Sequence, residues 1–162
     1  MLLDPLDRRF LALLQADNRR ALRDYADALG ISAPTCLRRL RRLEAQGVIV
    51  RHAAIVDAAR AGFVVTAFIE VSLVDAAGTH MAAFERRMQL CADVMQCSEL
   101  SGDVDYMLTV LARDMQSFSE FTRKHLADDR SIRTYRTLLV LKNVKRQLDV
   151  PWTTHDLSKL TL

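Results

Sequence analysis

Apolar residues in the first third of the chain recur at the three- and four-residue spacing of amphipathic helices. This spacing predicts helices over about 4–16, 22–29 and 31–47. Gly30 separates the second helix from the third, and a glycine-containing turn between two helices is typical of a helix-turn-helix. We therefore predict a helical N-terminal domain built around that motif.

Two short strand-like runs follow at 48–50 and 53–56, on either side of Arg51 and His52. They predict a two-stranded wing with Arg51 and His52 near its tip. From there the two side chains would reach a phosphate or a minor groove. His52 is equally compatible with an ordinary exposed turn residue.

The second half of the chain changes to the two-residue period of half-buried strands, beginning at 65–73. The predicted order is a strand at 65–73, a helix after Gly78-Thr79, strands at 94–100 and 106–111, a helix from Asp114 to about Ala127, and a strand at 133–144. This βαββαβ order is that of a ferredoxin-like domain. The whole chain is thus predicted to be α+β, with a winged helix-turn-helix followed by a ferredoxin-like regulatory domain.

These elements divide the chain into a domain at 1–56, a hinge at 57–63, a second domain at 64–146 and a tail at 147–162.

The helices of a βαββαβ unit lie on one face of its sheet. The other face carries Phe68 and part of the apolar run 138–141. We expect a second copy of the chain to cover this face, since an exposed apolar sheet face is unfavourable.

The charge of the chain is concentrated in its first domain. Residues 1–55 carry ten Arg and six acidic residues, whereas the remaining residues carry 13 basic and 14 acidic ones. The helix predicted at 31–47 holds four of these arginines within five positions. A basic segment that contains a helix-turn-helix is expected to meet nucleic acid phosphates.

Positions on this helix suggest a division of labour. Thr35, Arg38 and Arg42 point away from its apolar stripe, and Arg39 and Arg41 flank them. We assign the first three to base edges and the other two to phosphates. The full predicted DNA-binding set adds the helix start and the wing: Ser32, Ala33, Pro34, Thr35, Arg38, Arg39, Arg41, Arg42, Arg51 and His52.

Other classes of protein receive no support from the sequence. Cys36, Cys91 and Cys97 lack the spacing of a zinc site or of a secreted disulfide framework. The start of the chain has no signal-peptide pattern, and no apolar run approaches the roughly 20 residues of a membrane span. We expect a cytoplasmic protein without a cofactor, metal or membrane partner, and we find no catalytic motif.

Three stretches resemble the leucine-responsive regulator/AsnC family of transcription factors, also called feast/famine regulators. They are LDRRFLALLQADNR at 6–19, LGISAPTCLRRLRRLEAQGVI at 29–49 and LSGDVDYML at 100–108. The resemblance implies DNA binding by a winged helix-turn-helix domain. It also implies dimers that associate further, to tetramers or octamers, and a small effector, commonly an amino acid.

The turn at 102–106, GDVDY, matches the effector motif of that family, so the resemblance implies a binding role for Gly102, Asp103 and Asp105. Glycine allows close approach of the backbone, and aspartate suits an α-ammonium group. The same residues would also form a plain hairpin turn with no ligand. Our predicted effector set adds nearby polar and aromatic groups: Ser98, Ser101, Tyr106, Thr134 and Thr137. Since this segment adds no further charge, a neutral or apolar effector is favoured.

Two alternatives stay open at this stage. Siroheme decarboxylases resemble the same two-domain fold, so an enzyme acting on a tetrapyrrole is one of them. The scattered positions of His80, His125 and His155 argue against that alternative. The other is a regulator that needs no effector.

Overall fold

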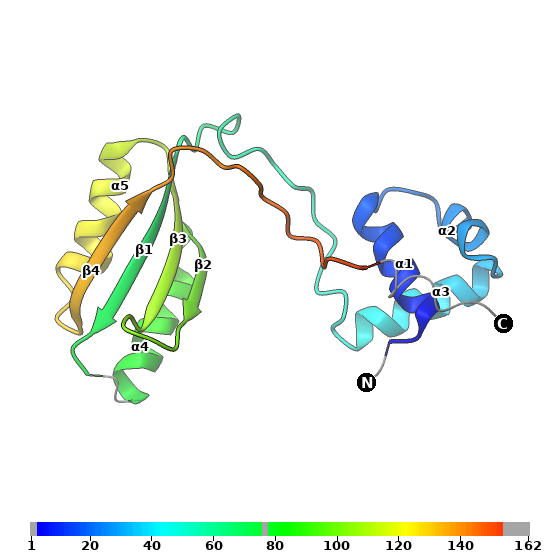
Figure 1. Cartoon of the computed structure of the whole chain (residues 1–162), viewed down its shortest axis with the longest axis horizontal. Helices are drawn as coiled ribbons and strands as arrows, with labels where there is room; N and C mark the ends of the chain where they lie inside the picture. Colours follow the sequence, from blue (N-terminus) through cyan, green and yellow to red (C-terminus); the bar gives the residue numbers. More distant parts are fainter. Residues whose placement is uncertain (1–2, 76–77, 154–162) are drawn as a thin grey trace. The chain divides into compact units, whose positions relative to one another are not determined.

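The computed structural model describes residues 3–75 and 78–153 (Figure 1). The described residues form two compact units. The helical domain comprises the residues up to Ala54 together with those from Lys145 onward, and the sheet domain is Ile55–Val144. The predicted hinge at 57–63 is a turn within the sheet domain, closed by a 2.8 Å hydrogen bond from Phe63 N to Ala58 O. No helix in the described ranges is long and apolar enough to cross a bilayer.

The predicted N-terminal helices are confirmed as α1 (Pro5–Ala16), α2 (Leu22–Leu29) and α3 (Ala33–Ala45). Gly30 ends α2 with φ +67°, a left-handed conformation that glycine adopts without strain and that lets the chain turn directly into α3. Phe10, Cys36 and Leu43 are fully buried where the helices meet. Burial of a Phe or Leu side chain contributes about 1.5–3 kcal/mol, so this small core supports the motif.

The strand pairing predicted for the wing is wrong. Residues 48–56 form no strand in the described structure, and most of them are exposed. Val50 is 87% exposed and Ile55 81% exposed, so these apolar side chains cover nothing within the chain. A two-stranded hairpin is marginal without an apolar surface to pack on, and of these runs only Ile49 packs against the core of the helical domain.

The sheet domain has the predicted βαββαβ order. Its elements are β1 (Val65–Leu73), α4 (Gly78–Leu90), β2 (Val94–Glu99), β3 (Tyr106–Ala112), α5 (Met115–Thr122) with a π-helical turn at Arg123–Ala127, and β4 (Ile132–Leu139). The strands are antiparallel and lie in the order β2-β3-β1-β4. The β1 strand is therefore central, and its outward side chains lie between those of β3 and β4.

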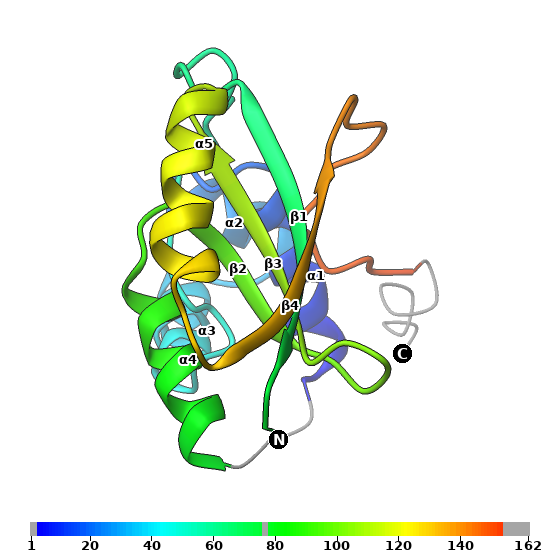
Figure 2. The same cartoon turned by 90° about the vertical axis from the view of Figure 1, so that its left-hand side faces the viewer.

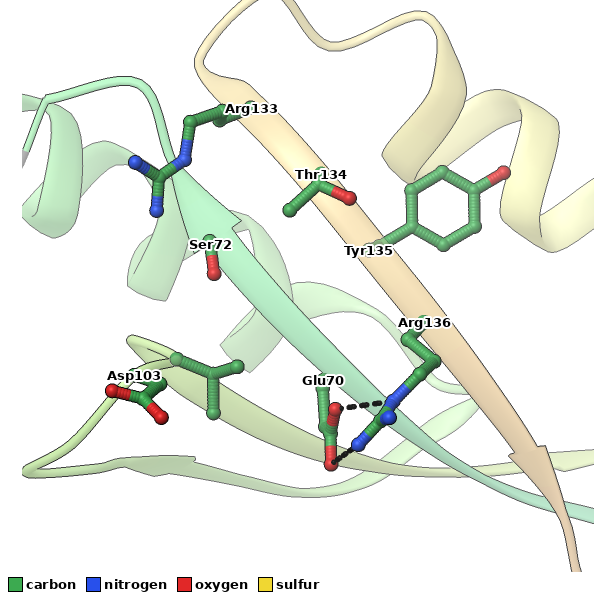
Figure 3. A pocket seen from close by; sticks show the side chains of 8 residues that line it. Glu70, Ser72, Asp103, Arg133, Thr134, Tyr135 and Arg136 are labelled. Carbon is green, nitrogen blue, oxygen red and sulfur yellow. Dashed lines mark hydrogen bonds and ion pairs between the residues drawn. The ribbon is translucent and has the colours of Figure 1, made fainter.

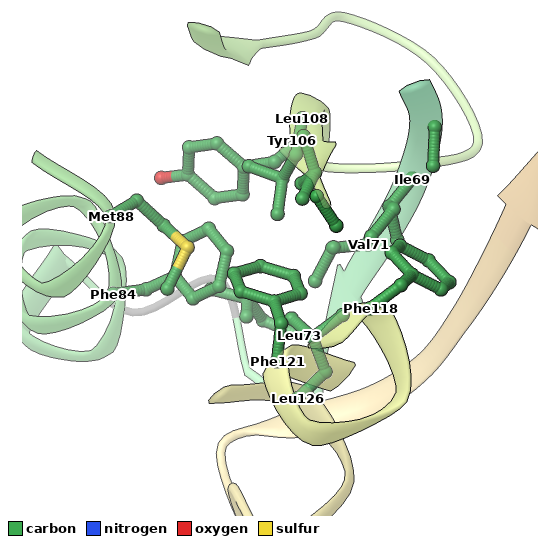
Figure 4. Close-up of a cluster of buried hydrophobic side chains, with 13 residues drawn as sticks. Ile69, Val71, Leu73, Phe84, Met88, Tyr106, Leu108, Phe118, Phe121 and Leu126 are labelled. Atoms are coloured by element: carbon green, nitrogen blue, oxygen red, sulfur yellow. The ribbon is translucent and has the colours of Figure 1, made fainter. Parts of the chain in front are cut away.

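Helices α4 and α5 cover one face of the sheet (Figure 2). Between helices and sheet lies a continuous core in which Phe84 and Met88 from α4 meet Phe118 and Phe121 from α5 (Figure 4). The alternation along β1 supplies Ala67, Ile69, Val71 and Leu73 to the same core. On the opposite face Phe68 remains 40% exposed and Leu138 42% exposed. The predicted uncovered face thus exists in the single chain.

The last strand is shorter than the predicted 133–144. Its partner β1 begins at Val65, and pairing between the two strands ends at Ala67↔Leu139, with one further bond from Val140 N to Thr66 O. The residues after this point have no strand to pair with, and Leu141 is 98% exposed. Apolar composition alone favoured a longer strand, but the length of the partner sets the end of β4.

The tail belongs to the helical domain. Trp152 packs against the core of that domain, and its indole N–H donates a 2.6 Å hydrogen bond to Gln15 Oε1 on α1. The chain therefore leaves the helical domain after α3 and returns to it after β4. Predicted tail residues from 154 onward lie outside the described residues.

Candidate DNA-binding surface and effector pocket

The start of α3 is presented to solvent. Ser32 caps the helix, accepting a 3.4 Å hydrogen bond from Thr35 N and donating a 2.9 Å bond to Thr35 Oγ1. Ser32 and Pro34 are exposed, and Ala33 and Thr35 are half-buried. The free amides and dipole of a helix N-terminus favour anions. Of the predicted DNA-binding set, these four residues lie at one end of the candidate recognition helix.

The arginines of α3 fall into two pairs. Arg38 and Arg41 are exposed, and neither forms an ion pair with another described residue. Arg39 and Arg42 instead turn toward α1. Arg39 Nη1 lies 2.6 Å from Asp4 Oδ2 and 2.7 Å from Asp7 Oδ1, and Arg42 Nη2 lies 2.5 Å from each oxygen of Asp7.

This cluster alters the ionisation of its members. Partial burial opposes the charged form of Asp4, but hydrogen bonds from Arg39 and from the Asp7 amide outweigh it and lower the pKa of Asp4. Burial likewise opposes the charged form of Arg39, and hydrogen bonds to Asp4 and Asp7 nevertheless raise its pKa. The charges of the cluster stabilise one another.

Arg51 and His52 lie in the extended segment where a wing was expected, and both are exposed. His52 Nε2 lies 3.0 Å from Glu44 Oε1 near the end of α3. His52 is thus held beside the helix rather than at a hairpin tip. Arg51 makes no ion pair with another described residue, so it remains available at the surface.

In the sheet domain a pocket of about 370 Å³ lies between β1, the start of β4 and the loop before β3. Its lining residues are Glu70, Ser72, Asp103, Val104, Arg133, Thr134, Tyr135 and Arg136. Arg136 forks onto Glu70, with Nε 2.7 Å from Oε2 and Nη2 2.8 Å from Oε1 (Figure 3). These hydrogen bonds from Arg136 lower the pKa of Glu70.

Arg133 and Asp103 carry opposite charges at this pocket, and neither forms an ion pair with another described residue. Figure 3 shows them on either side of Ser72. The pairing of β1 with β4 passes from Ser72↔Thr134 to Leu73↔Ile132, so Arg133 is the extra residue of a β-bulge. A bulge changes the direction of a side chain relative to the regular strand, and this one gives Arg133 its place at the pocket.

Of the predicted effector residues, Asp103 and Thr134 line the pocket. Ser101 and Gly102 precede Asp103 in the exposed loop. Gly102 has φ +156°, which L side chains rarely adopt, while a Cβ there would meet open space. The backbone conformation of the loop, rather than a close neighbour, therefore requires this glycine.

The structure does not bring the other predicted effector residues into the pocket lining. Asp105 instead fixes the loop to β1, accepting a 2.7 Å hydrogen bond from Leu73 N while its own N–H donates to Val71 O. Tyr106 is buried against Phe84 on the helix side, and its hydroxyl donates to Glu85 Oε1. Burial raises the pKa of Tyr106.

Strand order and register explain why Ser98 and Thr137 lie outside the pocket lining. Ser98 lies on β2, at the opposite edge of the sheet from β4, and accepts a 3.1 Å hydrogen bond from Gln96 Nε2. Thr137 pairs with the buried Ile69, which places it on the helix-covered face. Sequence spacing did not reveal either position.

Comparison with known families matches the two domains separately. Residues 3–44 match the AsnC-type helix-turn-helix domain, and residues 66–150 match the Lrp/AsnC ligand binding domain. The chain belongs to the Lrp/AsnC family of transcriptional regulators. The family resemblance of the three sequence stretches is thereby confirmed.

Similar proteins within the Lrp/AsnC family span nearly the whole chain. The leucine-responsive regulatory protein of Rhizobium meliloti is 35% identical over 143 residues, which cover 88% of this chain and 92% of that protein. The Bkd operon transcriptional regulator of Pseudomonas aeruginosa is 34% identical, covering 88% and 93%. A transcriptional regulator of Neisseria meningitidis, solved as a complex with L-methionine, has a TM-score of 0.85 at 29% identity, covering 93% and 97%.

These relatives are transcriptional regulators and not enzymes, so the decarboxylase alternative is set aside. The comparison also sharpens what sequence reasoning missed in this Lrp/AsnC protein. Glu70, Arg133 and Arg136 also line the pocket, so its lining carries charges that the expectation of a neutral or apolar effector did not take into account. The alternation of β1 already placed Glu70 and Ser72 on one face, but the partner strand and its bulge became visible only in the fold.

Proposed function

We propose that this Lrp/AsnC regulator binds DNA as an oligomer and that an amino acid, bound in the sheet-domain pocket, modulates its assembly or its DNA binding. The observation that carries the proposal is the pocket at which Arg133 and Asp103 have no ionic partner among the described residues. Charged groups left without a partner beside a cavity favour a ligand that supplies opposite charges.

An α-amino acid offers the required pair of charges. The Arg133 guanidinium suits its carboxylate, because the planar fork donates two parallel hydrogen bonds. The Asp103 carboxylate suits its ammonium group, with the Ser72 and Thr134 hydroxyls nearby in the lining. The Neisseria relative was solved with L-methionine, which makes methionine the first ligand to test.

For DNA we propose contacts from the exposed part of α3. Arg38 is assigned to base edges and Arg41 to phosphates, with Ser32, Ala33, Pro34 and Thr35 at the helix start. Arg51 and His52 would extend the contact from the segment after α3. We also propose a homodimer through the open sheet face around Phe68 and Leu138, which associates further to tetramers or octamers. A DNA-binding regulator of this kind would act in the cytoplasm.

Thermal unfolding of the full-length protein in the presence of each of the twenty amino acids tests the effector. A ligand at about 100 times its Kd stabilises the folded state by about 2.7 kcal/mol, so methionine or another amino acid is expected to raise the Tm by several degrees. Asp103→Asn and Arg133→Gln should abolish the shift.

The matched controls are Asp128→Asn and Arg130→Gln, which remove the same charges from exposed positions outside the pocket lining. They should retain the shift. A screen without any shift in the wild type would favour a regulator that needs no effector. A shift that survives in both pocket variants would contradict the assigned site.

A further inference from the structure

The Asp4, Asp7, Arg39 and Arg42 side chains form a closed cluster between α1 and α3. Asp7 is only 2% exposed, and both of its carboxylate oxygens accept hydrogen bonds from arginines of the recognition helix. Asp4 and Asp7 are also bound to each other's backbone, with 2.7 Å from Asp7 N to Asp4 Oδ1 and 3.3 Å from Asp4 N to Asp7 Oδ2. The hydrogen bonds at the start of α1 therefore hold both carboxylates in place independently of their contacts with α3.

The cluster divides the positive charge of α3. Two carboxylates neutralise two guanidinium groups, and Arg38 and Arg41 remain without an ionic partner among the described residues. Arg39 and Arg42 are three positions apart, so they lie on the same side of the helix, toward α1. Arg38 and Arg41 are displaced from them by one position and are exposed.

We propose that Asp7, with Asp4, is a positioning element that determines DNA specificity by keeping Arg39 and Arg42 within the protein when DNA is bound. This inference rests on DNA binding by the helix-turn-helix, and it revises the initial assignment of Arg42 to bases and Arg39 to phosphates. The held pair fixes the orientation of α3 on α1. It also limits the number of cations available to phosphates of any sequence.

The burial of Asp7 explains why the arginines stay. If Arg39 and Arg42 moved to DNA phosphates, a nearly inaccessible carboxylate would lose its partners. An unpaired buried charge is far more unfavourable than a solvent-exposed ion pair is favourable. The arginines thus gain less from a phosphate at the surface than the protein loses at Asp7.

The salt dependence of DNA binding measures the number of cations that contact phosphates. Each contact contributes about −0.9 to the slope of log K against log salt concentration, or roughly a further threefold loss of affinity between 50 and 200 mM salt. We suggest measuring this slope for the full-length protein on poly(dI-dC) and on a duplex selected from a random pool by the wild type. Binding of the wild type to either DNA tests the function itself, separately from the cluster.

Asp7→Asn should steepen the slope on poly(dI-dC) by up to about 0.9 for each released arginine per bound protomer. It should also lower the ratio of affinities for the selected and the random duplex, since released arginines bind any phosphate. Asp24→Asn, which removes an equal charge from an exposed position on α2, should leave the slope and ratio as in the wild type. An unchanged slope in a folded Asp7→Asn protein would overturn the proposal.

Three further variants keep the test decisive if Asp7→Asn does not fold, as circular dichroism will reveal. Asp4→Asn retains a good helix cap and leaves Arg39 bound to Asp7, so the wild-type slope is expected. Arg42→Gln should leave the wild-type slope unchanged, whereas its neighbour Arg41→Gln should reduce it by about 0.9. Equal reductions in Arg42→Gln and Arg41→Gln would show that Arg42 contacts DNA and would refute the inference.

Discussion

The helical domain and the sheet domain each pair carboxylates with arginines, but they expose the pairs to water very differently. Asp7 is 2% exposed and is held by Arg39, whose side chain is 21% exposed. Glu70 is 16% exposed, and its partner Arg136 is 69% exposed. The Glu70–Arg136 fork has good geometry, yet its guanidinium remains in solvent. In the cluster of the helical domain the carboxylate of Asp7 is enclosed between two helices, although Asp4 and Arg42 each keep 43% of their side chain exposed.

The difference shows that similar hydrogen-bond lengths serve different purposes. In the helical domain the ion pairs determine how α3 lies on α1, because breaking them leaves a buried charge. In the sheet domain the solvated pair fixes little of the fold. It leaves the neighbouring Arg133 and Asp103 available beside the pocket. Burial, rather than the pairing itself, separates the structural cluster of the helical domain from the solvated pair beside the pocket.

The largest expected effect is on stability. Asp7→Ala should lower the free energy of unfolding of the helical domain by about 1.5–3 kcal/mol, because it removes charge-assisted hydrogen bonds from Arg39 and Arg42 and leaves Arg39, whose side chain is only 21% exposed, poorly solvated. Glu70→Ala should change the stability of the sheet domain much less, since water solvates the released Arg136. Urea unfolding followed by circular dichroism measures both. Equal losses in the two variants would break the contrast between the domains.

A smaller effect is expected on DNA affinity. Arg38→Ala should weaken binding to the selected duplex by about 1–3 kcal/mol and relax the preference at one base position. Arg130→Ala removes the same charge from an exposed position of the sheet domain outside the pocket lining and serves as the control, with affinity as in the wild type. Gel shifts on the selected duplex and on its single-base variants provide the measurement. Wild-type affinity and selectivity in Arg38→Ala would contradict the assigned recognition surface.

The smallest effect concerns pH, where the two domains should respond in different ranges. Because the pKa of Asp4 is lower in the folded than in the unfolded state, the ionised Asp4 stabilises the folded state at pH values above its ordinary pKa of 3.8. This stabilisation is lost as the pH falls through the pKa of the folded state. Burial, with Lys124 nearby, lowers the pKa of His125 in the sheet domain, although Asp93 opposes the shift. Protonation in the unfolded state therefore begins to destabilise this domain as the pH falls below 6.5.

Unfolding curves at pH 3–8, with tryptophan fluorescence for the helical domain and far-UV circular dichroism for the whole chain, separate these ranges. Trp152 is the chain's single tryptophan and packs in the helical domain. His125→Gln should flatten the dependence between pH 5 and 7, and Asp4→Asn should flatten the dependence below pH 4. A pH profile that neither variant changes would show that these groups do not carry the linkage.

Local sequence patterns predicted most of the fold. The strand at 65–73 and the helix at 22–29 have the predicted bounds, since each is long enough for its period to be clear. The prediction of a wing was wrong because runs of three and four apolar residues indicate a propensity for strands but do not ensure that the two runs pair with each other. The end of β4 was placed too late because its apolar residues continue beyond the strand that pairs with it.

The candidate sites were predicted less completely than the fold. Asp103 and Thr134 were recognised from a motif and a strand, but Arg133 depended on a bulge between β1 and β4. Asp105 and Tyr106 lie beside the motif in sequence, yet a backbone bond and the core occupy their side chains. Adjacent positions in a strand or at its end point to different faces, so proximity in sequence did not predict a common site.

By itself the sequence determined the class of this protein: a basic helix-turn-helix joined to a βαββαβ domain, because hydrophobic period and charge are local properties of the chain. Only the tertiary structure decided which arginines of α3 face outward and which charges meet at the pocket. The first outcome depends on the contact between Asp7 and Arg42, which are 35 positions apart in the sequence. The second depends on the pairing of Ser72 on β1 with Thr134 on β4. Burial and strand register bring such residues together, and neither is encoded at any one position.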